Sequence, residues 1–197
     1  MGLIRIVGGA LRGRRLRVPD RGVRPTSERT REAIFDVLGP GTVDGARVLD
    51  LYAGTGALGI EALSRGAARA DFVEGSRVVA ARLAENLETL GLEARSRVHV
   101  ADLGRGALPP GAAGPWDLVF LDPPYAGDAG ARWLRALAAA AWPPGGGVVV
   151  HERGQGKPYD TPAGLALLTE RDYGDTTVAI YRAAGAAPEG AAGKGSV

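Results

Sequence analysis

The sequence has 197 residues, of which 45% are hydrophobic, carries a net charge of +2 and contains no cysteine. This length suits one good-sized domain, or one domain with a small appendage. The lack of cysteine excludes disulfides, thiolate metal sites and a thiol nucleophile, and no apolar run reaches the roughly 18 residues of a membrane span. Arginines interrupt the first apolar residues, so no secretory signal is predicted and we expect a cytoplasmic protein.

The positive charge is concentrated near the N-terminus. Residues 1–35 carry nine arginines and three acidic residues, a net charge of +6, which leaves −4 for the rest of the chain. Arginine can bind phosphate through two parallel hydrogen bonds and can stack on bases. This segment therefore favours a polyanionic partner such as nucleic acid. The alternative is a solvated arm in an arginine-rich sequence.

Two short elements are predicted in this basic segment. In LIRIVGGALRGRRLRVP (residues 3–19), apolar and basic residues alternate on both sides of Gly8-Gly9, which predicts a hairpin with a row of arginines on its polar face. In RPTSERTREAIFDVL (residues 24–38), Thr26 or Ser27 can cap a helix. The apolar face of this helix would hold Ala33, Ile34, Val37 and Leu38.

From residue 47 onward, short apolar runs alternate with helical stretches. We predict strands at 47–52, 70–74, 97–102, 117–122 and 146–152, with helices near 57–65, 77–90 and 128–142. Such strands, joined by crossover helices, indicate a parallel sheet covered on both faces. Two further runs, 165–173 and 176–183, are separated only by Gly174-Asp175, and so short a turn allows only antiparallel pairing at the sheet edge.

The predicted fold is therefore α/β and Rossmann-like, with a mostly parallel seven-stranded sheet, helices on both faces, a C-terminal antiparallel hairpin and a small N-terminal hairpin and helix. We divide the chain into a basic extension (1–40), an α/β domain (41–184) and a Gly/Ala-rich tail (185–197) that we expect to be disordered.

A glycine-rich motif follows the first strand of the α/β domain. Gly54, Gly56 and Gly59 form G-x-G-x-x-G between a strand and a helix, the context in which this pattern indicates a nucleotide-type cofactor. The alternative is a tight strand–helix turn. Asp50 stands four residues before Gly54, and a carboxylate there suits a cationic or amine-bearing ligand better than a pyrophosphate.

Two more acids end the next two strands. Glu74 can accept hydrogen bonds from both ribose hydroxyls, and Asp102 can accept one from the exocyclic amine of adenine. Each acid alone could be a solvated loop carboxylate. Together with Asp50 they lie at the carboxyl edge of one sheet, where they fit adenosine joined to an amino acid. S-adenosylmethionine matches that description and NAD does not.

The segment VFLDPPYAGD (residues 119–128) places Asp122, two prolines and Tyr125 directly after a buried strand. Proline fixes φ and donates no backbone hydrogen bond, so the pair ends the strand and stiffens the residues after it. The alternatives are a simple stop signal and a clamp that holds Asp122 and Tyr125 for a ligand.

LDLYAGTGALGIEALSRGA together with DPPY resembles the class I S-adenosylmethionine-dependent methyltransferases that modify exocyclic amines. RIVGGALRGRRL and RPTSERTREAIFDVL closely resemble the bacterial RsmD family, whose members methylate N2 of a guanine in 16S ribosomal RNA; the likeness covers roughly residues 4–182.

This resemblance implies that residues 41–184 are the S-adenosylmethionine-dependent methyltransferase domain. It also implies three sets of site residues. Cofactor contacts are implied at Asp50, Tyr52, Ala53, Gly54, Gly56, Glu74, Gly75, Ser76, Asp102 and Leu103. Contacts with the target base are implied at Asp122, Pro123, Pro124 and Tyr125, and contacts with RNA at Arg5, Arg12, Arg14, Arg15, Arg24, Arg29 and Arg31.

The implied partner is ribosomal RNA in an assembling small subunit, bound by a monomer. Three alternative functions stay open. One is an adenine-N6 methyltransferase, because DPPY serves that chemistry too. The others are an NAD-type oxidoreductase and a catalytically silent RNA-binding protein. His99 and His151 lack metal-ligand spacing, so no metal is predicted. Glu152 is assigned no role.

Overall fold

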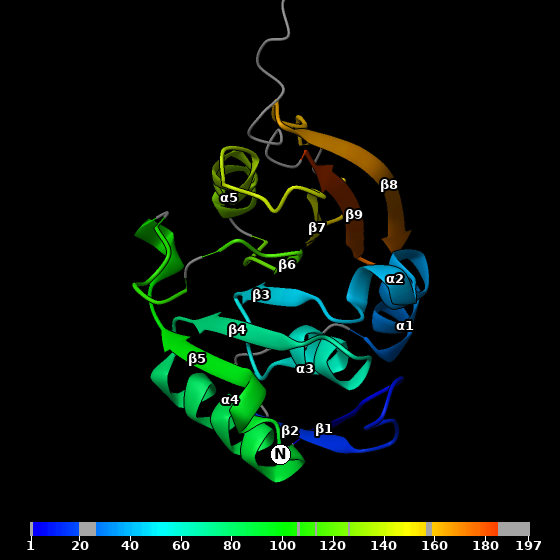
Figure 1. Cartoon of the computed structure of the whole chain (residues 1–197), viewed down its shortest axis with the longest axis vertical. Coiled ribbons are helices and arrows are strands. Elements are labelled where there is room, and N and C mark those ends of the chain that lie inside the picture. The colour runs from blue at the N-terminus through cyan, green and yellow to red at the C-terminus, as the bar shows by residue number, and fades with distance from the viewer. Residues whose placement is uncertain are drawn as a thin grey trace, which may run out of the picture.

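A single seven-stranded sheet forms the centre of the computed structural model, in the order β5-β4-β3-β6-β7-β9-β8 (Figure 1). Residues 2–19, 27–105, 107–112, 114–125, 127–156 and 159–184 are described. The strands are β3 (Arg47–Leu51), β4 (Arg69–Glu74), β5 (Ser96–Val100), β6 (Leu118–Leu121), β7 (Gly147–Gly154), β8 (Leu165–Tyr173) and β9 (Thr176–Ala183). The first five are parallel, and β9 runs antiparallel to β7 and β8. The predicted sheet and its C-terminal hairpin are confirmed.

The four predicted helices are present, and a short additional helix, α2 (Pro40–Val43), was not predicted. The predicted ones are α1 (Glu28–Leu38), α3 (Ala57–Ser64), α4 (Arg77–Leu90) and α5 (Ala129–Ala138), with short 3-10 turns at Glu93–Arg95 and Leu103–Arg105. Helix α5 ends four residues before the predicted end, because the Trp142 indole donates to the Leu137 carbonyl (2.9 Å) and Pro143 follows. None of the described helices is long and apolar enough to cross a membrane.

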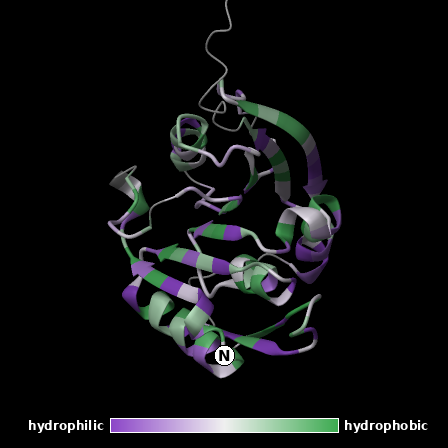
Figure 2. Cartoon of the chain, viewed as in Figure 1, coloured by the Kyte–Doolittle hydropathy of each residue, from purple (hydrophilic) through white to green (hydrophobic). Residues whose placement is uncertain are grey.

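Each face of the sheet has its own hydrophobic core, because neighbouring residues of a strand point to opposite faces. Val48 and Phe120 face the core that contains α1, α3, α4 and the N-terminal residues, whereas Leu49 and Leu121 face the core built on α5. The predicted coverage of both faces is therefore confirmed. The edge strand β5 instead mixes hydrophilic and hydrophobic residues (Figure 2), and none of its residues is fully buried.

The predicted N-terminal hairpin is present as β1 (Gly2–Arg5) and β2 (Arg15–Val18). Leu16 and Val18 are buried against the body. The alternating register places the outward positions of both strands on one face. That face carries Leu3, Arg5, Arg15 and Arg17. The two strands are joined by residues 6–14, the hairpin loop.

Helix α1 is capped by the Ser27 hydroxyl, which accepts from the Thr30 amide (3.1 Å). Its buried face differs from the predicted one: Phe35 is buried, whereas Val37 is 39% exposed. Phe35 belongs to the core, where its ring packs against the Phe120 ring with centroids 5.7 Å apart, and the Arg65 guanidinium lies over it, 4.7 Å from its centroid.

Candidate active site

A cavity of about 780 Å³ opens at the carboxyl ends of β3, β4, β6 and β7. The order of the strands reverses between β3 and β6, and crevices at such switch points are where open α/β sheets bind ligands. The lining residues come from the loops after these strands, from the N-terminal extension and from the β8–β9 turn. They include Asp50, Tyr52, Ala53, Gly54, Glu74, Ser76, Asp122, Pro123, Pro124 and Tyr125, all predicted site residues, together with Glu152.

The glycine motif forms the turn between β3 and α3. Gly54 and Gly56 have φ of +55° and +88°, a region open to glycine without strain. Tyr52 has φ +60° although it carries a side chain, a conformation that costs free energy and is concentrated at functional sites. A Cβ on Gly59 would collide with the Phe72 ring. The glycines therefore allow both the turn and the close packing of α3 on the sheet.

Asp50 is nearly inaccessible to solvent, at 2% exposure, yet it lines the cavity. Its Oδ2 accepts a hydrogen bond from the Gly59 amide at 2.9 Å. Burial raises the pKa of the Asp50 carboxyl from 3.8 to about 7, the Gly59 hydrogen bond opposes that rise, and the nearby Glu152 and Glu74 carboxylates add to it. A cation bound beside Asp50 would favour its ionised form.

Glu74 organises the other side of the glycine turn. One carboxylate oxygen accepts from the Gly54 amide (2.9 Å) and the other from the Ser76 amide (2.7 Å). Each carboxylate oxygen can accept more than one hydrogen bond, so Glu74 retains acceptor capacity toward the cavity while it fixes the turn. Ser76 in turn caps α4 by accepting from the Val79 amide (3.4 Å).

The Asp122–Tyr125 segment forms the opposite wall, directly after β6. The Tyr125 hydroxyl is hydrogen-bonded to the Thr176 hydroxyl at 2.6 Å, and its ring lies beside Gly154, where an added Cβ would lie 3.4 Å from the ring. The C-terminal hairpin thus fixes the orientation of the Tyr125 ring. Tyr173 and Thr176, from the turn of that hairpin, also line the cavity.

Acidic side chains dominate the electrostatics of the cavity. Asp50, Glu74, Asp122 and Glu152 all line it, and among the lining residues in the described part of the chain none is basic. Glu152, for which the sequence suggested no role, is 2% exposed and stands at the carboxyl end of β7. Such a cavity suits a cationic ligand and amine donors, and it disfavours the pyrophosphate of a dinucleotide.

Four of the predicted cofactor residues are not among those that line the cavity: Gly56, Gly75, Asp102 and Leu103. Leu103 is 2% exposed and packs in the core built on α5. Asp102 is exposed, and its Oδ1 accepts from the Gly104 amide at 2.8 Å. A Cβ on Gly56 would collide with Leu83, so this glycine serves the packing of α3 on α4.

The sequence also missed several lining residues. Ser27 and Thr30 belong to the first turn of α1, and their hydroxyls are hydrogen-bonded to each other at 2.8 Å. Pro19, which follows β2, reaches the rim as well. The helix-capping pattern around Ser27 was visible in the sequence, but only the packing of the extension on the body brings it to the cavity.

The predicted RNA-binding arginines have different environments. Arg12, Arg15 and Arg29 are exposed; Arg14 is exposed too, although its guanidinium donates to the Thr89 carbonyl (3.0 Å). Arg5 pairs with Glu28 at 3.0 Å on the surface. The prediction for Arg31 is wrong: Arg31 is 1% exposed and donates to the Arg5 carbonyl (2.7 Å), so no RNA can reach it.

One further predicted arginine, Arg24, and the tail at 185–197 lie outside the described residues. Arg17, which was not predicted to contact RNA, is exposed on the same hairpin face as Arg15.

The family model described as Conserved hypothetical protein 95 matches residues 4–182. The chain belongs to this family. Ribosomal RNA small subunit methyltransferase D of Escherichia coli (strain K12) is 46% identical over 125 residues, which cover 63% of this chain and 61% of that protein, less than two thirds of its length. The protein of the same name from Haemophilus influenzae is 33% identical over 183 residues, which cover 92% of this chain and 94% of that protein.

Among solved structures, the putative methyltransferase yhhF from Escherichia coli matches with a TM-score of 0.80 and 36% identity, covering 94% of this chain and 100% of that chain. The predicted RsmD family and the class I methyltransferase fold are therefore confirmed. The roles of individual residues in the cavity stay predictions.

Proposed function

We propose that this protein transfers the methyl group of S-adenosylmethionine to the N2 amine of a guanine in small-subunit (16S) ribosomal RNA. The observation that carries the proposal is one cavity in which the acids at the ends of β3 and β4 face the Asp122–Tyr125 segment. The relatives named Ribosomal RNA small subunit methyltransferase D support the choice of RNA as substrate.

The cavity fits the proposed cofactor chemically. S-adenosylmethionine supplies a methyl group on a positively charged sulfur, and it has an amino acid part and an adenosine part. Asp50 and the Gly54 turn would hold the amino acid part, where the buried carboxylate complements its positive charge. Glu74 would accept hydrogen bonds from the ribose hydroxyls. NAD is disfavoured, because its pyrophosphate would meet acidic side chains and no basic one among the described lining residues.

The chain's contribution to the reaction is to position the amine. The N2 lone pair of guanine is delocalised into the ring, so the nitrogen attacks well only when its hydrogens are held and its geometry becomes more tetrahedral. Asp122 can accept one N–H hydrogen bond and the Pro123 carbonyl the other. The two prolines stiffen that carbonyl, and the Tyr125 ring can stack on a base that has left its helix. Good alignment of reacting groups is worth roughly 7–11 kcal/mol.

The RNA would reach the cavity from the hairpin side. Arg15 and Arg17 are exposed on the outward face of the hairpin, and Pro19 connects that hairpin to the cavity rim. Because this basic face is small, we propose that an assembling small subunit offers the substrate surface and that the protein acts on it as a monomer. The place of action is then the cytoplasm, where ribosomal RNA is found in bacteria.

One experiment tests the proposed function directly. Purified protein and labelled S-adenosylmethionine are incubated in three parallel reactions. One contains small-subunit particles, one naked 16S RNA and one DNA. Nucleosides from each substrate are then separated by mass spectrometry. We expect N2-methylguanosine from the RNA substrates. N6-methyladenosine in RNA or DNA would instead support the adenine-N6 alternative, and the absence of methyl transfer would contradict both.

The hairpin arginines give a second prediction. Replacing Arg15 and Arg17 together by alanine should weaken binding of 16S RNA and reduce the slope of log affinity against log salt by about 0.7–0.9 for each phosphate that is no longer bound. Filter binding at several salt concentrations measures both effects. Arg135→Ala, which removes a single exposed arginine of α5 on the other face of the sheet, is the control for Arg15→Ala and Arg17→Ala measured singly, and a loss of RNA affinity there equal to that of either single variant would refute a specific role for the hairpin.

A further inference from the structure

The hairpin loop lies directly on the C-terminal end of α3. The Ala10 amide donates to the Ser64 carbonyl (2.7 Å), an acceptor left open at the end of that helix. The Ser64 hydroxyl donates to the Gly8 carbonyl (2.6 Å) and accepts from the Leu11 amide (2.9 Å). A Cβ on Gly9 would collide with the Ser64 carbonyl. The backbone of the hairpin loop therefore packs directly against the backbone of α3, and a side chain at position 9 would not fit.

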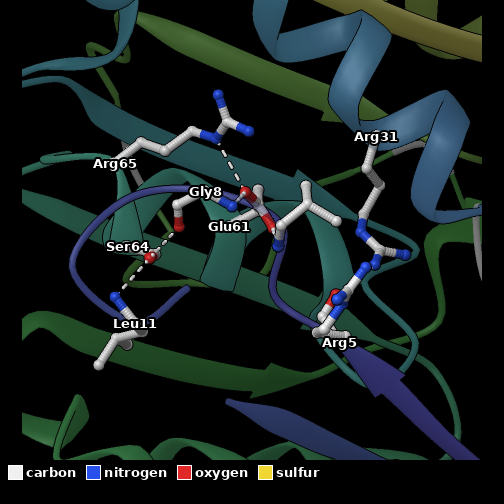
Figure 3. A network of polar contacts seen from close by, with 8 residues as sticks. Arg5, Gly8, Leu11, Arg31, Glu61, Ser64 and Arg65 are labelled. Carbon is white, nitrogen blue, oxygen red and sulfur yellow. Dashed lines mark hydrogen bonds and ion pairs between the residues drawn. The ribbon is translucent and has the colours of Figure 1, made fainter. Parts of the chain in front are cut away.

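Glu61 is the centre of this contact. Its carboxylate accepts from the Val7 amide (2.9 Å) and the Gly8 amide (2.7 Å), and it pairs with the Arg65 guanidinium at 2.8 Å (Figure 3). The residue is 1% exposed. A buried carboxylate is costly unless it is fully hydrogen-bonded, and charge-assisted bonds of this kind are about twice as strong as neutral ones. The hairpin loop therefore supplies two of the hydrogen bonds that the buried Glu61 carboxylate accepts.

Two arginines extend the contact to α1. The Arg65 guanidinium, held by Glu61, stacks on the Phe35 ring of that helix. Arg31, also on α1, donates to the Arg5 carbonyl at the end of β1 (Figure 3). Burial lowers the pKa of the Arg31 guanidinium, and the carboxylates of Glu61, Glu28 and Glu152 oppose that fall. The hairpin, α1 and α3 are thus joined through buried charges.

The same elements border the cavity. Helix α3 begins at the glycine turn, and its eight residues span about 12 Å. Asn86 on α4 adds a second connection: its side chain bonds both the amide and the carbonyl of Arg17 (2.9 and 3.1 Å) and donates to the Thr55 carbonyl in the glycine turn (3.2 Å). The basic hairpin is therefore fixed to the elements that form the proposed cofactor site.

We propose that Glu61 is a positioning residue for the RNA. By holding the Val7 and Gly8 amides, Glu61 fixes the outward arginines of the hairpin relative to the cavity, so that RNA bound to the hairpin presents its target base to Asp122. This inference rests on the proposed function. It assigns to a buried acid, which touches neither RNA nor cofactor, control over how well the RNA is bound.

The test is Glu61→Gln, which keeps the shape but leaves only one good acceptor for the two amides. We expect the dissociation constant for 16S RNA and the RNA KM to rise about tenfold, with kcat and the dissociation constant for S-adenosylhomocysteine within about twofold. Asp117→Asn is the matched control, because the Asp117 carboxylate likewise binds a backbone amide and an arginine (Arg47), at the amino end of β6 away from the cavity. Wild-type RNA affinity in Glu61→Gln would refute the proposal, as would an equal loss of affinity in Asp117→Asn.

A double-mutant cycle separates positioning from general weakening. If Glu61 acts through the arginines, adding Glu61→Gln to Arg15→Ala/Arg17→Ala should change the RNA dissociation constant by no more than about twofold, whereas independent effects multiply. Ser64→Ala, which removes two hydrogen bonds to the same loop, replaces Glu61→Gln if that variant does not fold by circular dichroism. The RNA-binding measurements test Glu61 even if wild-type protein transfers no methyl group, a result that would contradict the proposed function alone.

Discussion

Asp122→Ala is expected to reduce methyl transfer to 16S RNA by about a thousandfold or more, a loss of roughly 4 kcal/mol of transition-state stabilisation. Asp122 lines the cavity directly after β6 and has the chemistry to accept an N–H of the target amine. Alanine removes the acceptor and its charge, so the amine is neither aligned nor polarised. The cofactor side of the cavity is unchanged, and calorimetric titration with S-adenosylhomocysteine should give a dissociation constant within about twofold of wild type. A tritiated-methyl assay measures the transfer.

Two comparisons make this prediction specific. Asp122→Asn keeps one acceptor oxygen and loses the charge, so its rate should fall between those of wild type and Asp122→Ala. Asp128→Asn changes an exposed carboxylate six residues further along, which lies 3.6 Å from Arg132, and should leave the rate unchanged. Normal turnover in Asp122→Ala would remove the amine-holding role from this segment.

The strands were accessible from the sequence because apolar runs of four to eight residues indicate strands that are buried on both faces of a sheet. All seven strands of the sheet lie within two residues of their predicted ends. The two-residue turn at Gly174-Asp175 dictated the C-terminal hairpin, and the glycine motif located α3. These features depend on local chain geometry, which a single sequence encodes directly.

Features that depend on contact between distant segments were not accessible. Arg31 was grouped with the other arginines of the basic segment, yet the Arg5 carbonyl and three carboxylates hold it inside the protein. Glu61 stands in an apolar helix with no sign that a loop more than fifty residues earlier supplies its partners. Asp102 was predicted to end its strand, but β5 ends at Val100, and because β5 is the edge strand its end is not part of the cavity lining.

The affinity for S-adenosylmethionine should rise with pH and then level off near pH 7. In the ligand-free protein the pKa of the Asp50 carboxyl is raised from 3.8 to about 7, chiefly by burial. Its ionisation therefore opposes folding, and the ligand-free protein should lose stability as the pH rises from about 4 to about 7. A cation beside Asp50 favours the ionised form, so below pH 7 binding must release about one proton. The association constant should then increase about tenfold per pH unit below about pH 6, about fivefold between pH 6 and 7, and by no more than about twofold above pH 7.

Calorimetry at several pH values, with Asp50→Asn as the key variant, decides whether Asp50 is the titrating group. Asparagine can still accept from the Gly59 amide, but it cannot ionise, so the pH dependence should disappear and the affinity at pH 7.5 should fall about tenfold or more. Glu152→Gln provides the control, because Glu152 is also buried at the cavity and helps to raise the pKa of Asp50. If Asp50 titrates, the association constant of Glu152→Gln still rises with pH. It levels off at a lower pH than in wild type, because one nearby negative charge is gone. The opposite result would be a pH dependence of the association constant that persists in Asp50→Asn and vanishes in Glu152→Gln. It would assign the proton released on binding to Glu152 and leave Asp50 as a fixed hydrogen-bond acceptor for the glycine turn.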